Sequence, residues 1–537
     1  MRAEDVRTRV LEAQDSPAGV TIYRTWIDGL LDLDFLTMTG PLTLVGCHLP
    51  EEMTLRHAQI GTIDLSSTNV WGLRAKGLRT RELNLGGGRF SDILELEHAQ
   101  IDGTFRLSAA SIGSFTAYGL KVGGSLMARN LYNHPQYRGG VAFYLENAEI
   151  GGDVVLDGST ITGLDGPAIV ANGAKVGGVF SLDGAILRGQ GEGDAVSIIE
   201  AATGEVDLSG AVLRSEQGNA LCIDGTQVRG EVRLDGINAV SNTRDNTIRM
   251  VSMDVSGAIV LSGLVRNRSG QAVSVHKATV NGGLNVRDVE IHASSFRGAA
   301  LEISSCDVGG ALICVPNEIV NSGSDPELDL TATKVGRAFA IKTEGLARVT
   351  LHDLTYQVTR GSVDAWLTML RDHTIRYEAQ PYQQLAAVHR SAGHEHTARR
   401  VLIAQQQDLR RRGDPGNKLW HWFLGVTLGY GYRPSRAVIG LLVTFLLALC
   451  LVWTTNAYNG LTPAKDRPAD SCSPVNRISL AADLAIPLVK LGGTPRCELA
   501  NGPAGQWATG AGWVVQILGW SFATLSVAGF TGLVRKS

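Results

Sequence analysis

GDVVLDGSTI, which begins at Gly152, is the first of four similar phrases that recur at a constant spacing along this chain. The others are GVFSLDGAIL from Gly178, GEVDLSGAVL from Gly204 and GEVRLDGINA from Gly230. Each phrase alternates apolar and polar residues and carries a glycine-bounded turn, and such a pattern at a fixed period is typical of a β-solenoid. Alternate residues should point inward. One inward column is expected to contain Val155, Phe180, Val206 and Val232.

The repeat extends beyond these phrases with a changed period. TIDL at Thr62, ELNL at Glu82 and TFRL at Thr104 recur at a shorter spacing, which is the coil length of pentapeptide-type β-helices with four short sides. The later register continues as far as GRAFAIKTEG from Gly336. The sequence therefore predicts a mainly β protein whose right-handed β-solenoid covers residues 41–352, with coils of about 20–22 residues followed by coils of 26.

Composition limits the function classes. With 537 residues the chain exceeds the size at which a single core stops growing, so a repeat array or several domains are expected. The formal net charge is −3, which gives no electrostatic footprint for nucleic acid over the whole chain. The 64 glycines fall mostly in the repeats, where they indicate tight corners.

Both ends of the solenoid are expected to carry caps, because an open coil would offer strand edges to other chains. Residues 1–40 contain a short amphipathic helix that uses Val6, Val10 and Leu11, and they do not resemble a secretory signal. Residues 353–416 are helical, with one helix over 362–373. A helical hairpin of tetratricopeptide-like spacing follows over 381–412, turning at Gly393, and is expected to dock on the solenoid as its C-terminal cap.

Residues 417–537 have the composition of a membrane region. The stretches 437–455 and 512–534 are apolar and long enough to cross the hydrocarbon layer. The aromatic stretch 419–432 suits the membrane interface. The expected interface anchors are Trp420, Trp422, Tyr430, Tyr432, Arg433 and Arg436.

Charge and cysteine usage predict the topology. Basic residues precede the first span and follow the second, so the positive-inside rule predicts a multi-pass protein of the cell membrane with its solenoid and C-terminus in the cytoplasm. The loop 456–511 would then face outside. Cys472 and Cys497 both fall in that loop, where an oxidising environment would let them pair. The solenoid cysteines, Cys47, Cys222, Cys306 and Cys314, are expected to be small buried side chains.

The segment 478–493 between the spans is apolar but too short to cross the bilayer. Two interpretations stay open. One is a re-entrant half-helix and loop of the kind that lines channel pores, and the other is an interfacial helix that packs over the hairpin. The residues on which a pore role would depend are Asp483, Pro487, Lys490, Gly492 and Gly493.

Other motifs have simpler structural explanations. Asp157, Asp183 and Asp235 share one corner of the repeat, where aspartate before glycine satisfies a turn without any metal. GQGEG at 189–193 opens no helix of the dinucleotide-binding kind, and HEH at 394–396 lacks the spacing of a zinc protease. The sequence predicts no catalytic residues, no metal and no cofactor.

Several features together resemble a known family. They are the G-x-L-x-L-x-G-A coils, the helical hairpin, GYGYRPSRA at 429–437 and the pattern D-x-x-x-P-x-x-x-L at Asp483, Pro487 and Leu491. Over nearly its whole length the chain resembles actinobacterial two-pass membrane proteins with a cytoplasmic pentapeptide-repeat-like β-solenoid. Members are often labelled membrane-associated oxidoreductases, so the resemblance implies an oxidoreductase, although no nucleotide fingerprint, redox cysteine pair or haem motif accompanies it here.

Three functional hypotheses follow. The first is a membrane-anchored cytoplasmic solenoid that acts as a binding or scaffolding module without catalysis, with membrane lipid and a protein of unknown identity as partners. The second is a homo-oligomeric channel or pore that uses the two spans and the segment 478–493. The third is the oxidoreductase implied by the family label.

Overall fold

The computed structural model describes residues 1–134, 140–342, 344–412, 435–463, 472–486 and 497–530. The chain divides into two compact units, residues 1–388 and 389–537.

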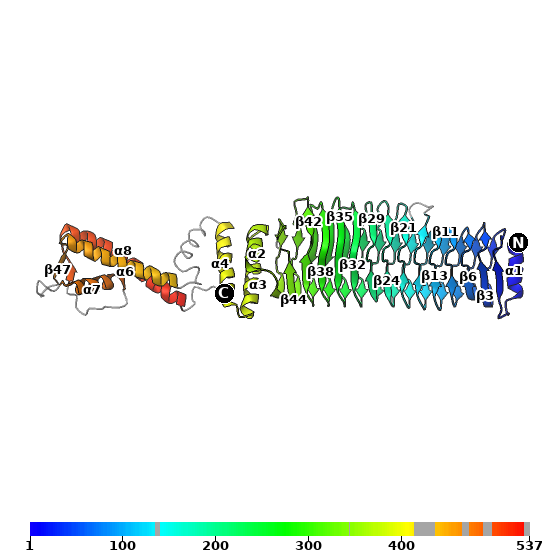
Figure 1. Cartoon of the computed structure of the whole chain (residues 1–537), viewed down its shortest axis with the longest axis horizontal. Helices are drawn as coiled ribbons and strands as arrows, with labels where there is room; N and C mark the ends of the chain where they lie inside the picture. Colours follow the sequence, from blue (N-terminus) through cyan, green and yellow to red (C-terminus); the bar gives the residue numbers. More distant parts are fainter. Residues whose placement is uncertain (135–139, 343, 413–434, 464–471, 487–496, 531–537) are drawn as a thin grey trace. The chain divides into compact units, whose positions relative to one another are not determined.

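The first unit is a parallel β-solenoid that runs from β1 (Val20–Tyr23) to β46 (Thr355–Thr359) (Figure 1). Each coil consists of short strands joined by tight corners. An early coil contains β6 (Gln59–Asp64), β7 (Asn69–Val70), β8 (Leu73–Arg74) and β9 (Arg79–Thr80). A later coil contains β20 (Val154–Val155), β21 (Thr160–Gly163), β22 (Ile169–Val170) and β23 (Lys175–Val176). The predicted fold class is confirmed.

The strand register follows the spacing of the sequence phrases. Leu83 pairs with Ile63 on one side and with Phe105 on the other, which is the shorter spacing expected for the early coils. In the later coils Phe180 pairs with Val154 and Val206, which is the longer spacing of the glycine phrases. The predicted inward column was therefore wrong at one place. Val154 belongs in it, and Val155 pairs with Ser181 in the neighbouring outward column, because a shift of one residue moves a strand side chain to the other face.

The core is a set of stacked apolar columns inside the coils. One column is continuous through successive parallel pairs, and its members are Leu42, Ile63, Leu83, Phe105, Leu126, Val154, Phe180, Val206, Val232, Ile259, Leu284, Leu312 and Phe339. All of them are fully or almost fully buried. Each coil therefore buries its apolar side chains only by stacking on its neighbours, which makes stability additive along the array.

Buried hydroxyl and thiol groups recur at one corner of the coils. Thr333 Oγ1 donates to the Ile303 carbonyl at 2.7 Å, and Ser159 Oγ donates to the Ala128 carbonyl at 2.9 Å. Cys306 Sγ lies 3.2 Å from the Val275 carbonyl in the same way. These groups satisfy carbonyls of the preceding coil. Cys47, Cys222, Cys306 and Cys314 are all buried, as the sequence predicts.

Glycines at another corner allow the coils to stack closely. A Cβ at Gly177 would lie 2.0 Å from the Gly151 carbonyl oxygen, and a Cβ at Gly151 would lie 2.3 Å from that of Gly123. No side chain tolerates such a distance, so the neighbouring coil would have to move away and stretch its ladder hydrogen bonds. The double-glycine corners of the sequence are therefore a packing requirement.

Gly177→Ala tests this requirement. We expect the substitution to destabilise the surrounding coils by about 2 kcal/mol, because the added methyl group overpacks a backbone contact that cannot relax without loss of the ladder. Local opening free energies from hydrogen exchange on the full chain would measure it. Gly140→Ala is the matched control, since nothing lies within 4 Å of a Cβ there. Equal effects of the two substitutions would contradict the interpretation.

Helices cover both ends of the solenoid. The first is α1 (Ala3–Glu12), in which Val6 and Val10 are fully buried. The expectation for Leu11 was wrong: its side chain is 46% exposed, because a helix turns 100° per residue and Val6 and Val10 already define the face that covers the coil. The exposed face of α1 carries charged residues, which prevents other chains from pairing with this end.

At the other end, α2 (Val363–Thr368) continues as a π-helical turn (Met369–His373), as predicted for 362–373. Trp366 is 2% exposed and packs against Phe339 and Tyr356 of the last coils. In α3 (Gln380–Ser391), the side-chain amides of Gln380 and Gln384 donate to carbonyls of residues 354 and 356 at 2.9 and 2.6 Å. These bonds give hydrogen-bond donors to two carbonyl groups at the open edge of the last strand, β46. The second unit begins within the last turn of α3, and α4 (Glu395–Arg412) follows a turn at Gly393.

The remaining helices of the second unit form an antiparallel pair and a shorter partner. They are α6 (Ser435–Ala457), α7 (Pro474–Ala485) and α8 (Pro503–Phe530), and β47 (Leu461–Pro463) pairs antiparallel with β48 (Cys497–Leu499). The second span was predicted to start at residue 512. Its helix, α8, begins earlier, at Pro503, because proline suits the first turn of a helix. Both α6 and α8 are long and apolar enough to cross a membrane.

Candidate functional site

A groove of about 710 Å³, called the flank groove below, runs along one flank of the solenoid across several coils. Its floor includes the corner glycines Gly123, Gly151 and Gly177, which carry no side chains to fill it. Stacked residues of the adjacent outward column form its wall, and they are Gln100, Lys121, Glu149, Lys175, Ala202 and Gln227. The groove is thus a consequence of the glycine corners.

Charged side chains are ordered within the flank groove. The Glu149 carboxylate lies between the ammonium groups of Lys121 and Lys175, at 3.1 and 3.4 Å. Hydrogen bonds from Lys121 and then Lys175 lower the pKa of Glu149 below its usual value. The Arg229 guanidinium reaches across two coils and donates to the Gly177 carbonyl at 2.5 Å. The groove runs across several coils and combines these ordered charges with apolar lining residues such as Val122 and Ile150, an arrangement that suits an extended partner.

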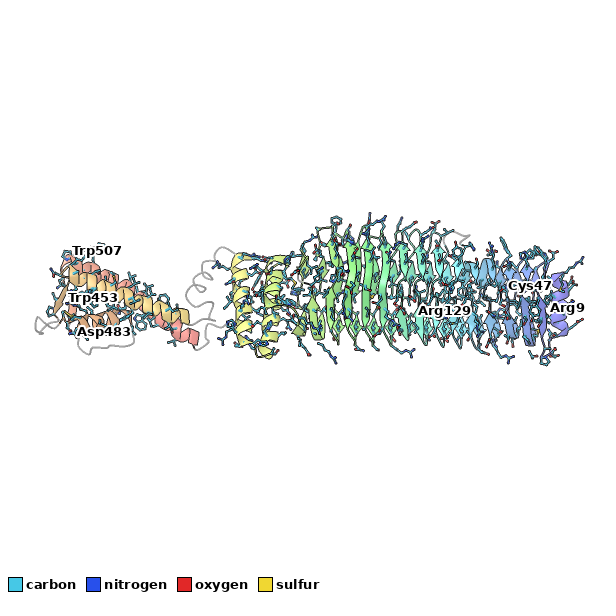
Figure 2. All side chains as sticks on the ribbon, viewed as in Figure 1. Arg9, Cys47, Arg129, Trp453, Asp483 and Trp507 are labelled. Carbon is cyan, nitrogen blue, oxygen red and sulfur yellow. A yellow bond between two sulfur atoms is a disulfide. The ribbon has the colours of Figure 1, made fainter. Side chains whose placement is uncertain are left out.

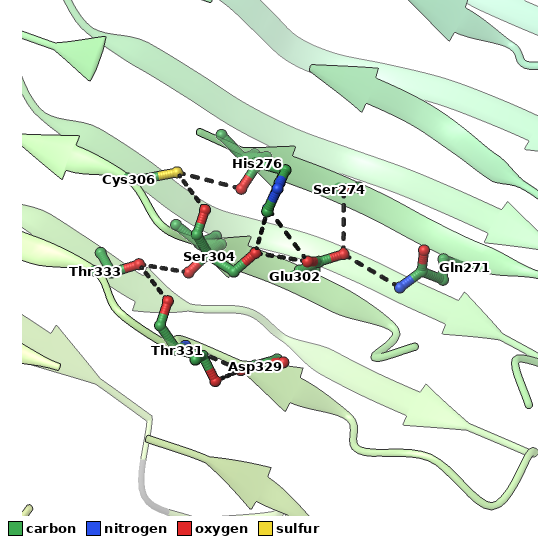
Figure 3. Close-up of polar contacts among 11 residues, drawn as sticks. Gln271, Ser274, His276, Glu302, Ser304, Cys306, Asp329, Thr331 and Thr333 are labelled. Carbon is green, nitrogen blue, oxygen red and sulfur yellow. Dashed lines mark hydrogen bonds and ion pairs between the residues drawn. The ribbon is translucent and has the colours of Figure 1, made fainter. Parts of the chain in front are cut away.

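A second polar cluster superficially resembles a hydrolase triad (Figure 3). His276 Nδ1 lies 2.8 Å from Ser304 Oγ, and Ser304 Oγ donates to Glu302 Oε1 at 2.5 Å. In a serine hydrolase the two ring nitrogens of the histidine face the hydroxyl and the carboxylate separately, whereas here one nitrogen, His276 Nδ1, faces both Ser304 Oγ and, at 3.7 Å, Glu302 Oε1. Ser274 and His276 are the ladder partners of Glu302 and Ser304, so the cluster is an outward polar ladder of the sheet.

The neighbouring thiol of Cys306 is buried against backbone carbonyls. Cys306 Sγ contacts the carbonyls of Val275 and Ser304, and burial raises the pKa of the Cys306 thiol to about 11. A protonated buried thiol is a poor nucleophile. Sequence reasoning did not find this cluster, because its residues come from different coils and become neighbours only by stacking.

Asp194 is the solenoid carboxylate whose titration is most disturbed. Its Oδ1 accepts the Asn219 backbone N–H at 2.7 Å, and burial raises the pKa of Asp194 to about 6. The folded state therefore binds a proton at pH values between about 6 and 3.8, the ordinary pKa, where the unfolded chain stays ionised. Through this group the solenoid gains stability as the pH falls from 7 towards 4.

Asp194→Asn should therefore raise the free energy of local opening of the surrounding coils at pH 7.5 by roughly 1–2 kcal/mol, because it removes an ionised, partly buried group and keeps the acceptor for Asn219. At pH 5 the difference between the variant and the parent should narrow, since Asp194 is then largely protonated. Hydrogen exchange of both full-length proteins at the two pH values measures this. A difference that stays constant with pH would contradict the assignment.

Two of the corner aspartates, Asp157 and Asp235, bond to side chains of neighbouring coils rather than to their own turns. Asp157 accepts from Ser181 Oγ at 2.5 Å and lies 3.4 Å from Arg129 Nε. Asp235 accepts from Ser262 Oγ at 3.4 Å. Among the residues that the structure describes, no group of three or more histidine, cysteine, aspartate or glutamate side chains could hold a metal ion.

The predicted site residues of the second unit are only partly described. Cys472 and Cys497 form a disulfide, with an S–S distance of 2.05 Å and their Cα atoms 5.4 Å apart. Asp483 lies half-buried in the last turn of α7 (Figure 2). Pro487, Lys490, Gly492, Gly493, Trp420, Trp422, Tyr430, Tyr432 and Arg433 lie outside the described residues, as does the side chain of Arg436.

The sequence leaves open whether the segment that contains α7 enters the helix pair or only lies over it. Ala481 and Ala485 of α7 are fully buried in a cluster with Ala448 and Val452 of α6 and with Val515 of α8. A Cβ at Gly519 would lie 2.1 Å from the Ala485 carbonyl oxygen. The C-terminal end of α7 therefore packs against the middle of both long helices, and Gly519 makes this close approach possible.

Comparison of the chain with models of protein families, with curated proteins and with solved structures finds no match. The fold and the candidate site define its class, which is a capped parallel β-solenoid followed by a pair of apolar helices long enough to span a membrane.

Proposed function

We propose that this protein is a membrane-anchored β-solenoid whose outer faces, and the flank groove above all, bind a partner at the cytoplasmic surface of the membrane. The observation that carries the proposal is one chain that joins a capped, rigid ladder bearing a groove of about 710 Å³ to two apolar helices. A rigid array of stacked coils offers a long, regular surface to partners.

The exposed surface of α6 and α8 supports the anchoring. Leu442 is 58% exposed on α6, and Ile517 and Trp513 are 66% and 65% exposed on α8. In water, apolar side chains of this size would cost about 1.5–3 kcal/mol each relative to burial, whereas a lipid environment covers them. Trp453 and Trp507 are also exposed, at the end of the hairpin that carries β47 (Figure 2), as expected for aromatic anchors at an interface.

Two measurements test the anchor and the binding module separately. The full chain should remain with neutral liposomes during flotation after a carbonate wash, and its release would contradict the anchor. For the groove, a photo-crosslinking residue at Gln100 should capture the same partner protein in repeated purifications from the native membrane. Substitution of Lys121 and Lys175 by glutamate should abolish the capture, since it reverses two charges of the groove wall.

The control for the groove is a crosslinking residue at Arg287, an exposed position on a different outward column. Capture of the same protein from both positions, or capture unchanged by the charge reversal, would show that the flank groove is not the binding surface.

A second candidate is the oligomeric channel, which the packing of α7 favours. A short helix that reaches the middle of two apolar helices is the arrangement of a re-entrant segment, and Asp483 lies in the last turn of this helix. A monomer in nanodiscs together with no conductance in planar bilayers would contradict the channel. No observation on the described residues supports the oxidoreductase activity that the family resemblance implies, so it is not proposed.

A further inference from the structure

Three loops on successive later coils stack into a ridge, called the arginine ridge below, which consists of residues 242–245, 268–270 and 294–298. Backbone hydrogen bonds join them: the Gln271 N–H donates to the Asp245 carbonyl at 3.1 Å, and the Ser294 N–H donates to the Gly270 carbonyl at 3.2 Å. The loops therefore keep the register of the ladder beneath them.

Buried asparagines hold these loops in place. Asn267 is 2% exposed, and its side chain donates to the carbonyls of Asp245 and Gln271 and accepts the backbone N–H groups of Ser269 and Gly270. Asn321, which is 5% exposed, accepts the Ser295 N–H at 2.9 Å in the next coil. The side chains at the loop tips are thus presented by a rigid base.

The tips of the arginine ridge are cationic. Arg244, Arg268 and Arg297 are exposed, one on each loop, and Arg266 is exposed on the strand below. None of these four guanidinium groups forms an ion pair with a carboxylate among the described residues. The acid of the same loops, Asp245, pairs with Arg249 at 3.1 Å.

The positive charge extends along the adjoining strand column. Arg188 pairs with Arg214 in the parallel ladder, one coil apart. Burial and then the neighbouring guanidinium groups of Arg188 and Arg268 lower the pKa of Arg214. Like charges stacked at strand spacing repel one another, and this repulsion is relieved when an anionic partner covers them.

An exposed aromatic side chain lies among these arginines. Phe296 is 72% exposed and precedes Arg297 at the tip of the third loop. Half-buried aliphatic residues, Ile186, Val212, Val240 and Leu264, lie on the adjoining strand face. The ridge thus combines a projecting apolar tip with basic residues, which is the combination that favours the boundary between headgroups and acyl chains.

We propose that the arginine ridge is a second membrane-contacting surface, which docks the solenoid on an anionic lipid bilayer through Arg244, Arg268 and Arg297 with Phe296 inserted among the headgroups. The proposal rests on the membrane anchoring proposed above and adds a lipid specificity to it. A single-stranded nucleic acid would need aromatic platforms for several bases, and Phe296 is the one exposed aromatic side chain on the three loops.

The test uses the full chain in liposomes. A polarity-sensitive fluorophore is attached at Phe296→Cys in a Cys450→Ala background, because Cys450 is exposed whereas the other free cysteines of the described residues are buried. We expect the label to move into an apolar environment, and to be quenched by bilayer nitroxides, in liposomes rich in anionic phospholipid but not in neutral ones. Arg268→Ala should lower the ratio of inserted to free label about fivefold.

Charge reversal and a control position complete the design. The triple variant Arg244→Glu, Arg268→Glu and Arg297→Glu should leave the label at position 296 in water with both kinds of liposome. The same label at Gln227→Cys, on another flank, should report an aqueous environment with both kinds of liposome. Carbonate-resistant flotation reports the membrane anchor independently.

A label in water with both lipids overturns the ridge proposal, whether or not the chain is inserted. A label that responds to soluble polyphosphate but not to anionic liposomes also overturns it. Insertion of the label without carbonate resistance supports the ridge and contradicts the anchor.

Discussion

Phe115→Ala should destabilise the central coils of the solenoid by about 3–5 kcal/mol, the range for removing a fully buried phenylalanine. The Phe115 ring is 0% exposed and stacks on Phe143 at a centroid distance of 4.4 Å, with Phe105 at 6.2 Å. Because Phe115 and Phe143 are ladder partners in adjacent coils, the cavity left by alanine would be lined by backbone that parallel hydrogen bonds hold in place. It cannot collapse.

Hydrogen exchange on the full chain measures this effect, because it reports the opening of each coil separately. A single unfolding transition does not describe a repeat array. Tyr118→Ala is the matched control: Tyr118 comes from the same coil, and its ring is 37% exposed. Protection should fall most in the coils next to Phe115 and least near the two caps, because each coil contacts only its neighbours. A uniform loss along the whole solenoid would contradict nearest-neighbour stacking.

The period of the sequence was sufficient to predict the solenoid. Glycines such as Gly204, Gly257 and Gly282 recur where a corner meets the backbone of the coil before it, so the spacing of these glycines reports the spacing of coils. The inward column was predicted with one error, at Val155. Two adjacent valines give no indication of which one faces inward, and only the pairing of Val154 with Phe180 decides the register.

Neither surface site could be predicted from the sequence. Lys121, Glu149 and Lys175 are far apart in the chain, and they form one groove wall only because unequal coils place them in the same column. Arg244, Arg268 and Arg297 lie at irregular intervals in loops of different length, so no repeat pattern connects them. Their proximity follows from the hydrogen bonds that stack the loops.

The depth of α7 has a similar explanation. The apolar character of 478–493 suits an interfacial helix as well as a re-entrant one, and hydropathy does not distinguish them. The distinction depends on whether a neighbouring helix leaves room for the end of α7. Gly519 leaves that room because it has no side chain. The Leu484 side chain of α7 lies 3.5 Å from the point that a Cβ on Gly512 would occupy.

Gly519→Leu should separate the end of α7 from α8. A Cβ at this position would lie 2.1 Å from the Ala485 carbonyl oxygen, and the leucine side chain would add further volume to the same contact. Overpacking of roughly 1.4–3 kcal/mol would raise the exposure of α7 about tenfold to 100-fold. The measurement is the rate at which a membrane-impermeant maleimide modifies Leu484→Cys in proteoliposomes, with Cys450→Ala as the background.

Gly510→Leu is the control, because nothing lies within 4 Å of a Cβ at Gly510 on the same helix. An unchanged rate in Gly519→Leu would mean that α7 does not depend on this contact. The same variant also separates the two candidate functions. In a channel that uses α7 as its re-entrant segment, Gly519→Leu should abolish conductance. In an anchored scaffold it should leave capture of the partner at Gln100 intact, because the flank groove and its charged wall belong to the first unit.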